Sequence, residues 1–150
     1  MLIGTNDANV ISNVLCVSDY VIELIYSLKL LVVVIEHNLK WNAHVDSICT
    51  KACMRLHYLK VLKRSSLSRD DLLYFYSSVI RPVLEHACPA WHTILTQQQT
   101  RQIESVQKRA LRIICNSNCI DCENFCIIHQ LQTLAERRTE LCKSFLIKAF

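Results

Sequence analysis

The chain has 150 residues with 51% hydrophobic and 20% charged side chains, which is enough for one buried core and excludes disorder throughout. One glycine and two prolines leave few positions for tight turns, which disfavours hairpin-rich all-β folds and glycine-rich phosphate loops. The net charge is +4, with one lysine against four acids in residues 1–39 and twelve Lys or Arg against five acids in residues 40–112. The excess of positive charge in residues 40–112 is compatible with a polyanionic partner. Taken by itself, however, the charge is explained more simply by a solvated surface.

The first 36 residues favour β-strands. Segments 9–17 and 21–26 are rich in Val and Ile, and the apolar run 30–35 predicts a strand buried on both faces. This run is much shorter than the ~20 residues of a membrane span, so no membrane partner is expected. No basic and then apolar leader precedes the nine cysteines, so we expect an intracellular protein, cytoplasmic or nuclear, with reduced thiols.

Helical patterns dominate the rest of the chain. Apolar residues at three- and four-residue spacings follow an Asn42 cap to about residue 64. Ser68, with an acid three residues later, predicts the capped start of a second helix, which Pro82 must kink or end. Thr96, with a glutamine three residues later, predicts a third. The last predicted helix carries four apolar residues, Leu131, Leu134, Leu141 and Phe145. The predicted fold is mainly α, a helical bundle with short β-strands near the amino terminus.

Several ordered blocks between residues 28 and 145 resemble one family. They are residues 29–35 (KLLVVVI), 39–45 (LKWNAHV), the basic helix 51–64, 76–92 (YSSVIRPVLEHACPAWH) and 103–114 (IESVQKRALRII). In this order they are similar to the thumb region that follows the polymerase palm in non-LTR retrotransposon reverse transcriptases. The family usually has Gly where Val32 stands and Tyr where His86 stands, and the cysteine-rich segment after Ile114 fits its pattern poorly.

The resemblance implies a catalytically incomplete fragment of an RNA-directed DNA polymerase. Catalysis in the family depends on palm aspartates that hold magnesium, and these are absent, so we expect neither enzyme activity nor a cofactor. Residues 1–39 are then a strand-rich remnant leading out of the missing palm, which becomes an expected partner, and residues 40–150 are a thumb-like helical region. The pair Asp70-Asp71 lies at a helix start, where carboxylates offset the helix dipole, which favours capping over metal binding.

Basic side chains form the candidate functional site. Two predicted helices carry Lys and Arg at one-turn spacings, which suits sequence-independent contacts with an RNA or DNA backbone. The predicted nucleic-acid-binding residues are Lys51, Arg55, Lys60, Lys63, Arg64, Arg101, Lys108, Arg109 and Arg112. Trp41 and Trp91 are favoured as core anchors over base-stacking groups. The alternative function is a helical protein-interaction module with no nucleic-acid role.

Metal and thiol chemistry are weaker alternatives. Thiolates and an imidazole can hold zinc, and the candidate ligands are Cys115, Cys119, Cys122, Cys126 and His129. These residues follow one another at steps of four and three, with no longer spacer between two pairs of ligands. This spacing favours a packed helical face over a zinc site, so we predict no metal.

His44 and Asp46 resemble a dioxygenase metal motif but point to different helix faces. The tryptophan and basic helix also resemble a module labelled as the amino-terminal region of AlkB homologue 8, without its dioxygenase activity. Cys88 is predicted to pack rather than react.

Overall fold

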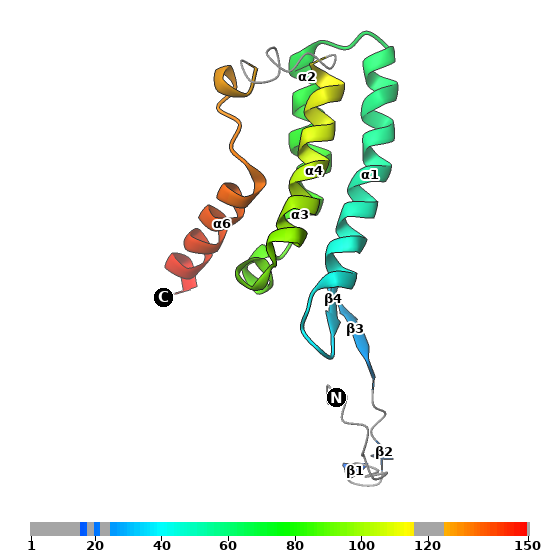
Figure 1. Cartoon of the computed structure of the whole chain (residues 1–150), viewed down its shortest axis with the longest axis vertical. Coiled ribbons are helices and arrows are strands. Elements are labelled where there is room, and N and C mark those ends of the chain that lie inside the picture. Colours follow the sequence, from blue (N-terminus) through cyan, green and yellow to red (C-terminus); the bar gives the residue numbers. More distant parts are fainter. Residues whose placement is uncertain (1–15, 18–19, 22–24, 116–124, 150) are drawn as a thin grey trace. The chain divides into compact units, whose positions relative to one another are not determined.

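The computed structural model describes residues 16–17, 20–21, 25–115 and 125–149, and it divides the chain into two compact units, Met1–His44 and Val45–Phe150. The architecture is mainly α with short antiparallel strands near the amino terminus, as the sequence predicts (Figure 1). Among the described residues no helix is both long and apolar enough to cross a membrane.

The amino-terminal unit contains two short antiparallel strand pairs. β1 (Cys16–Val17) pairs with β2 (Tyr20–Val21). β3 (Ser27–Leu30) pairs with β4 (Val33–Glu36), with Ser27 opposite Glu36 and Leu30 opposite Val33. Most of the predicted strand 9–17, and part of 21–26, lies outside the described residues.

The prediction of one strand buried on both faces over residues 30–35 is wrong. This run holds the end of β3, a two-residue turn and most of β4, and Leu31 in the turn is 83% exposed. The φ angles of Leu31 and Val32 are 45° and 75°, which is the left-handed region. Non-glycine residues enter this region at a cost of roughly 1–2 kcal/mol, because Cβ crowds the following carbonyl. A glycine at position 32, usual in the resembled family, carries no such cost.

The first long helix, α1 (Asn42–Arg64), begins in the amino-terminal unit, and its residues 45–64 belong to the second unit. Asn42, the predicted cap, is instead the first helical residue. Glu36 of β4 supplies a capping contact, because its Oε2 accepts from the Ala43 N–H at 3.1 Å. His44 is buried, and its Nδ1 accepts from the Val34 N–H at 3.3 Å. The start of α1 is thereby tied to the β3–β4 hairpin.

The carboxy-terminal unit is a bundle in which α4 contacts α1, α2 and α6 (Figure 1). After α1 the elements are α2 (Arg69–Phe75), the π-helical turn η1 (Tyr76–Ile80), α3 (Arg81–Glu85), the 3₁₀ turns η2 (Cys88–Ala90) and η3 (His92–Ile94), α4 (Gln97–Ile114) and α6 (Leu134–Ala149). The core consists of fully buried apolar side chains from α1, α2, η1, α3, α4 and α6, among them Ile48, Leu56, Leu59, Leu72, Ile80, Leu84, Ile103, Ile114 and Leu134.

Two predicted helix caps are confirmed. Ser68 Oγ accepts from the Asp71 N–H at 3.1 Å at the start of α2, and it donates to the Asp71 carboxylate at 2.6 Å. Thr96 and Gln99 form a reciprocal capping box at the start of α4, with bonds of 3.2 Å and 2.8 Å. Side-chain oxygens here satisfy amides that have no partner inside the helix.

The helical segment that begins with α2 becomes irregular just before Pro82, where the π-helical turn η1 leads into α3 and Pro82 is the second residue of α3. Pro82 has no N–H to donate to the preceding turn, and prolines and π-helical turns are the usual places at which a helix is irregular. One boundary of the last helix differs from the prediction, because Leu131 precedes α6.

Candidate nucleic-acid interface

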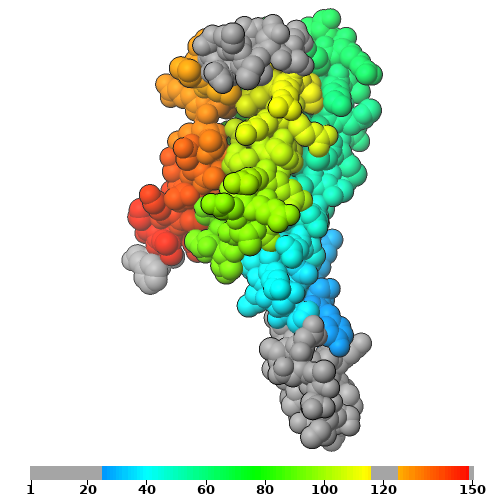
Figure 2. Space-filling view, in the orientation of Figure 1, coloured from blue at the N-terminus to red at the C-terminus, as the bar shows by residue number. Residues whose placement is uncertain are grey.

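Four of the predicted basic residues lie on the solvent side of α4. Its opposite face is buried through Ile103, Val106, Ala110 and Ile114, which fixes the rotation of the helix. The exposed cations are Arg101, Lys108, Arg109 and Arg112. Part of the surface of α4 lies open between α1 and α6 (Figure 2). We call these four residues the α4 basic face.

Three basic residues of α1 lie towards the carboxy-terminal end of α4. Lys63 Nζ donates to the Ile114 carbonyl oxygen at 2.6 Å. Carbonyls in the last turn of a helix lack intrahelical partners and carry partial negative charge, so a lysine there stabilises the end of α4. Lys60 and Arg64 flank Lys63 in sequence and are exposed. Lys63 thus joins this end of α1 to the end of α4, and Lys60 and Arg64 are its exposed neighbours on α1.

The remaining basic residues of α1 belong to a different side of the bundle. The Arg55 guanidinium donates to the Val79 carbonyl of η1. Arg55 also lines a shallow apolar groove of about 570 Å³ between α1 and the α2–η1 segment, together with Tyr58, Val61, Leu62, Phe75, Ser78 and Val79. Lys51 stands one turn before Arg55 and is half-buried. Lys63 thus contacts the end of α4, whereas Arg55 contacts η1.

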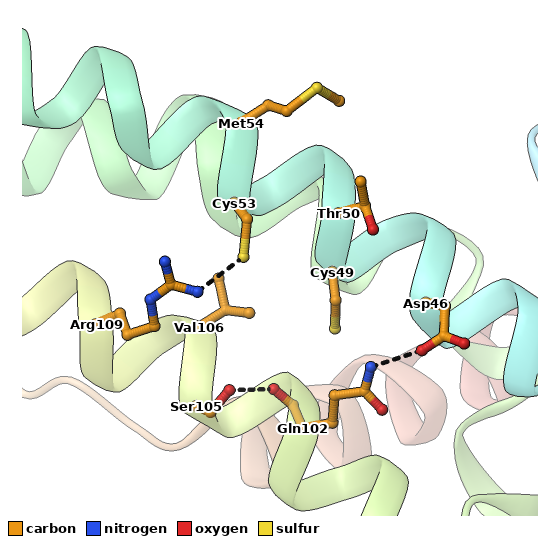
Figure 3. A pocket seen from close by; sticks show the side chains of 9 residues that line it. All are labelled: Asp46, Cys49, Thr50, Cys53, Met54, Gln102, Ser105, Val106 and Arg109. Atoms are coloured by element: carbon orange, nitrogen blue, oxygen red, sulfur yellow. Dashed lines mark hydrogen bonds between the residues drawn. The ribbon is translucent and has the colours of Figure 1, made fainter.

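A second groove, of about 620 Å³, runs between α1 and α4 (Figure 3). Asp46 Oδ1 accepts from Gln102 Nε2 at 2.7 Å, and Arg109 Nη1 donates to Cys53 Sγ at 3.1 Å. These two exposed contacts bridge the helices at either end of the groove. Arg109 therefore belongs both to the α4 basic face and to the groove wall.

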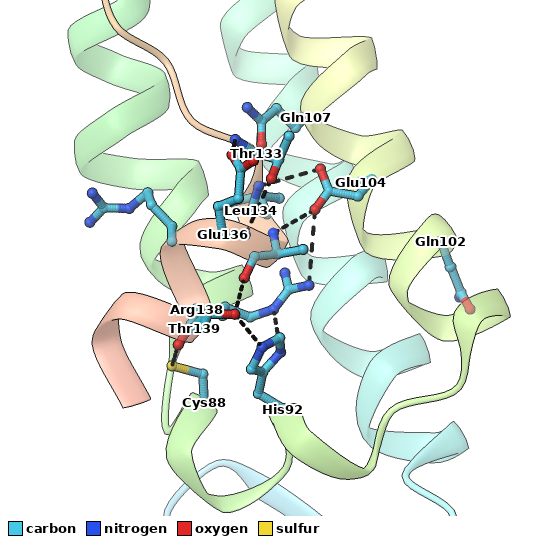
Figure 4. A network of polar contacts seen from close by, with 12 residues as sticks. Cys88, His92, Gln102, Glu104, Gln107, Thr133, Leu134, Glu136, Arg138 and Thr139 are labelled. Atoms are coloured by element: carbon cyan, nitrogen blue, oxygen red, sulfur yellow. Dashed lines mark hydrogen bonds and ion pairs between the residues drawn. The ribbon is translucent and has the colours of Figure 1, made fainter. Parts of the chain in front are cut away.

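The α6 side of α4 carries a buried charge that the sequence did not reveal (Figure 4). Arg138 of α6 is fully buried, and its Nη2 lies 4.0 Å from Glu104 Oε1. Its Nε donates to His92 Nδ1 at 3.3 Å, and the guanidinium carbon lies 5.8 Å from the centre of the Trp91 ring. Burial lowers the pKa of Arg138, and the Glu104 carboxylate opposes that shift.

Glu104 also holds the start of α6. Its carboxylate accepts from the Leu134 N–H at 3.3 Å and from the Ala135 N–H at 2.7 Å. Because Glu104 lies three residues after Arg101 and four before Lys108, it is the acid nearest to the α4 basic face in sequence. Its engagement with α6 leaves the exposed part of that face positively charged.

The predicted packing residues behave as expected. Trp41 and Trp91 are buried, and Trp91 Nε1 donates to the His86 carbonyl oxygen at 3.0 Å. Cys88 is buried, and burial raises the pKa of its thiol to about 12, with the neighbouring Cys142 adding to the shift. Buried thiols of this kind are unreactive, which agrees with the prediction that Cys88 packs rather than reacts.

The candidate zinc ligands are only partly described. Cys115 is buried at the carboxy-terminal end of α4, whereas Cys119 and Cys122 lie outside the described residues. His129 Nε2 lies 3.5 Å from Asp70 Oδ1, so that ring faces the start of α2. Within the described residues no group of three or more His, Cys, Asp or Glu is placed to hold a metal ion.

Comparisons with known proteins give two partial matches. Residues 41–81, which run from the start of α1 through η1, match the family described as "Alkylated DNA repair protein alkB homolog 8, N-terminal". Over 88 residues, 57% of the chain, the sequence is 27% identical to a probable RNA-directed DNA polymerase from transposon X-element of Drosophila melanogaster. That stretch is 10% of the polymerase, so the chain spans a small part of this relative. No solved structure matches the chain. The identity supports a reverse-transcriptase-like relationship.

Proposed function

We propose that this chain is the thumb-like part of a retrotransposon-type RNA-directed DNA polymerase and binds the backbone of an RNA or DNA duplex without reading its sequence. The observation that best supports this proposal is the α4 basic face, where Arg101, Lys108, Arg109 and Arg112 are all exposed on one helix. The likeness to a transposon polymerase supports the assignment. In this proposal the chain catalyses no step of its own, and its partner is the palm of the parent polymerase.

The physical basis of the proposed binding is counterion release. Each phosphate neutralised by Lys or Arg frees a condensed cation, so affinity falls steeply with added salt. The Lys63 contact with Ile114 holds this end of α1 beside the end of α4, and we propose that the exposed Lys60 and Arg64 there add to binding of the same backbone. Lys51 and Arg55 form a second, smaller basic patch beside η1, for which we propose a weaker contact.

The experiment compares two double variants of equal charge. Lys108→Gln with Arg112→Gln removes two cations from the α4 basic face, and Lys143→Gln with Lys148→Gln removes two exposed cations from α6. Fluorescence anisotropy with two unrelated duplexes across a salt series gives affinity and salt slope. We expect the first variant to weaken binding equally for both duplexes and to flatten the log–log slope by roughly 0.9 per lost phosphate contact.

Two results would contradict this proposal. One is no duplex binding by the unaltered chain at low salt, and the other is equal weakening by the two variants. The helical protein-interaction module would then be the better account. One observation favours that alternative, because the apolar groove beside η1 leaves Tyr58 60% and Val61 43% exposed.

A further inference from the structure

The groove between α1 and α4 holds two thiols and a guanidinium in one place. Cys49 and Cys53 stand one helical turn apart on α1, and both sulfur atoms turn towards α4 (Figure 3). Arg109 reaches from α4 to within 3.1 Å of Cys53 Sγ. The other residues that line the groove are polar and apolar: Asp46, Thr50, Met54, Gln102, Ser105 and Val106. A groove of about 620 Å³ is within the range, ~300–1,000 Å³, that small ligands occupy in proteins.

The two thiols differ in what surrounds them. Cys49 is only 7% exposed, and burial, with smaller contributions from Cys53 and Asp46, raises its pKa to about 11. Cys49 therefore stays a neutral thiol at pH 7. Cys53 is half-buried, open to the groove, and in contact with a permanent positive charge. Reactive cysteines are found in partly exposed, electropositive surroundings of this kind, whereas buried thiols are inert.

We propose that this groove is a thiol-modification site, at which Cys53 takes up one half of a small peptide disulfide of the glutathione type while Cys49 stays reduced. The Cys53 sulfur, after losing its proton to solvent, attacks one sulfur of the incoming disulfide. A new S–S bond forms, the original S–S bond breaks, and the leaving thiolate takes up a proton. Cys53 is oxidised and the departing half is reduced, so atoms and electrons balance. The Arg109 guanidinium offsets the negative charge of the attacking sulfur.

The modification has a consequence for nucleic-acid binding, which rests on the proposed function. A glutathionyl group brings two carboxylates and one ammonium into the groove beside Arg109. The guanidinium then has anionic partners within the groove, and the α4 basic face loses one of its cations. Modification of Cys53 is therefore expected to weaken duplex binding.

The first part of the test uses no nucleic acid. The reduced full chain is treated with glutathione disulfide at pH 7, and each cysteine is followed by mass spectrometry of peptides. We expect Cys53 to react faster than Cys49 and Cys88. Arg109→Gln should slow the reaction of Cys53 by about threefold or more, because no guanidinium then offsets the negative charge of the attacking sulfur. Lys143→Gln, an equal loss of charge on α6, should leave it unchanged. Equal reactivity of Cys49 and Cys53, or no effect of Arg109→Gln, overturns the proposal.

The second part measures duplex affinity before and after treatment. The treated chain should bind several-fold more weakly, and treated Cys53→Ser, with the fold checked by circular dichroism, should bind as the untreated chain does. Unchanged affinity after complete modification of Cys53 overturns the effect on binding. If the untreated chain binds no duplex, the proposed function fails, and the reaction rates still decide whether the groove is a modification site.

Discussion

The two sides of α4 are joined to their neighbours in different ways. On the α1 side the contacts across the groove are exposed and polar, between Asp46 and Gln102 and between Arg109 and Cys53. On the α6 side a fully buried arginine, Arg138, meets Glu104 and His92. Water competes for exposed pairs, which contribute little, whereas a buried charge that loses its partner is strongly destabilising.

The difference separates candidate function from stability within one helix. Residues of the α4 basic face project from the same helix as Glu104. Their replacement, however, leaves no buried charge without its partner. Substitutions on the α6 side, by contrast, should report on folding before they report on binding. Four predictions test whether this division holds.

The largest effect is expected from Glu104→Gln. The change removes the carboxylate nearest to buried Arg138 and weakens the contact with the start of α6. The free energy of unfolding, measured with urea, should fall by about 3 kcal/mol. Glu140→Gln, on the exposed surface of α6, is the matched control and should cost little. Adding Arg138→Met to Glu104→Gln should recover much of the loss, since no buried charge then remains. If Glu104→Gln is as stable as Glu140→Gln, the two sides of α4 do not differ in their contribution to stability.

A pH effect is expected on the same side, smaller because His92 is only half-buried. Burial and the neighbouring Arg138 lower the pKa of His92 from its ordinary 6.5. As pH falls below 6.5 the unfolded chain takes up this proton first, so this contribution to stability is complete above pH 6.5 and declines towards the lower folded-state pKa. Melting temperatures from pH 7.5 to 5.5 should show the decline in the unaltered chain and in His57→Asn, and less of it in His92→Asn. An unchanged profile in His92→Asn would rule out this group as the cause.

Lys63→Met tests the strongest contact that we assign to the α1 side. The substitution keeps an unbranched apolar side chain and removes the cation that donates to the Ile114 carbonyl. We expect a loss of about 1 kcal/mol in the free energy of unfolding, the usual size for a charged group at the end of a helix. Lys60→Met, one turn earlier and exposed, should change stability by less. If Lys63→Met lowers the free energy of unfolding as much as Glu104→Gln does, the two sides of α4 do not differ in the way described.

The smallest effect is expected from Asp46→Asn. Asp46 is exposed, and asparagine still offers an oxygen to the Gln102 amide. The free energy of unfolding should change by less than about 0.5 kcal/mol, as is common for exposed polar pairs. Urea unfolding of Asp46→Asn and Gln102→Ala measures the contribution from both helices. A cost above about 1 kcal/mol in either variant would show that the groove contacts hold the bundle together.

The sequence predicts those features that depend on residues close together in the chain. Apolar spacing identifies α1 and α4, and the three-residue signals at Ser68 and Thr96 locate two helix starts. The positive φ angles of Leu31 and Val32 have no such signal, because the residue types disfavour that conformation. The apolar run 30–35 therefore predicts one strand where the structure has a hairpin.

Features that join distant segments could not be predicted. Glu104 and Arg138 are separated by several turns and a connection, and no local pattern pairs them. The Lys63 contact with Ile114 likewise requires α1 to lie beside the end of α4. For the candidate site, the sequence therefore predicts the basic residues but not their distribution between the α4 basic face and the patch beside η1.

The wider turn η1 constrains how this protein can change in length. Leu72, Tyr76, Ile80 and Leu84 are buried at strict four-residue steps. In a regular α-helix each such step rotates the side chain by about 40°, so the row would drift away from the core. The π-helical turn between Tyr76 and Ile80 absorbs an extra residue and keeps the row aligned. Deletion of one residue within Tyr76–Ile80 would shorten that step to three residues and leave a regular α-helix with the buried row still aligned, because the turn holds one residue more than an α-helical turn. A deletion or insertion elsewhere between Ser68 and Pro82 would instead turn everything after it by about 100°. Natural variation should therefore remove a residue within η1 more readily than it inserts or removes one elsewhere in this segment.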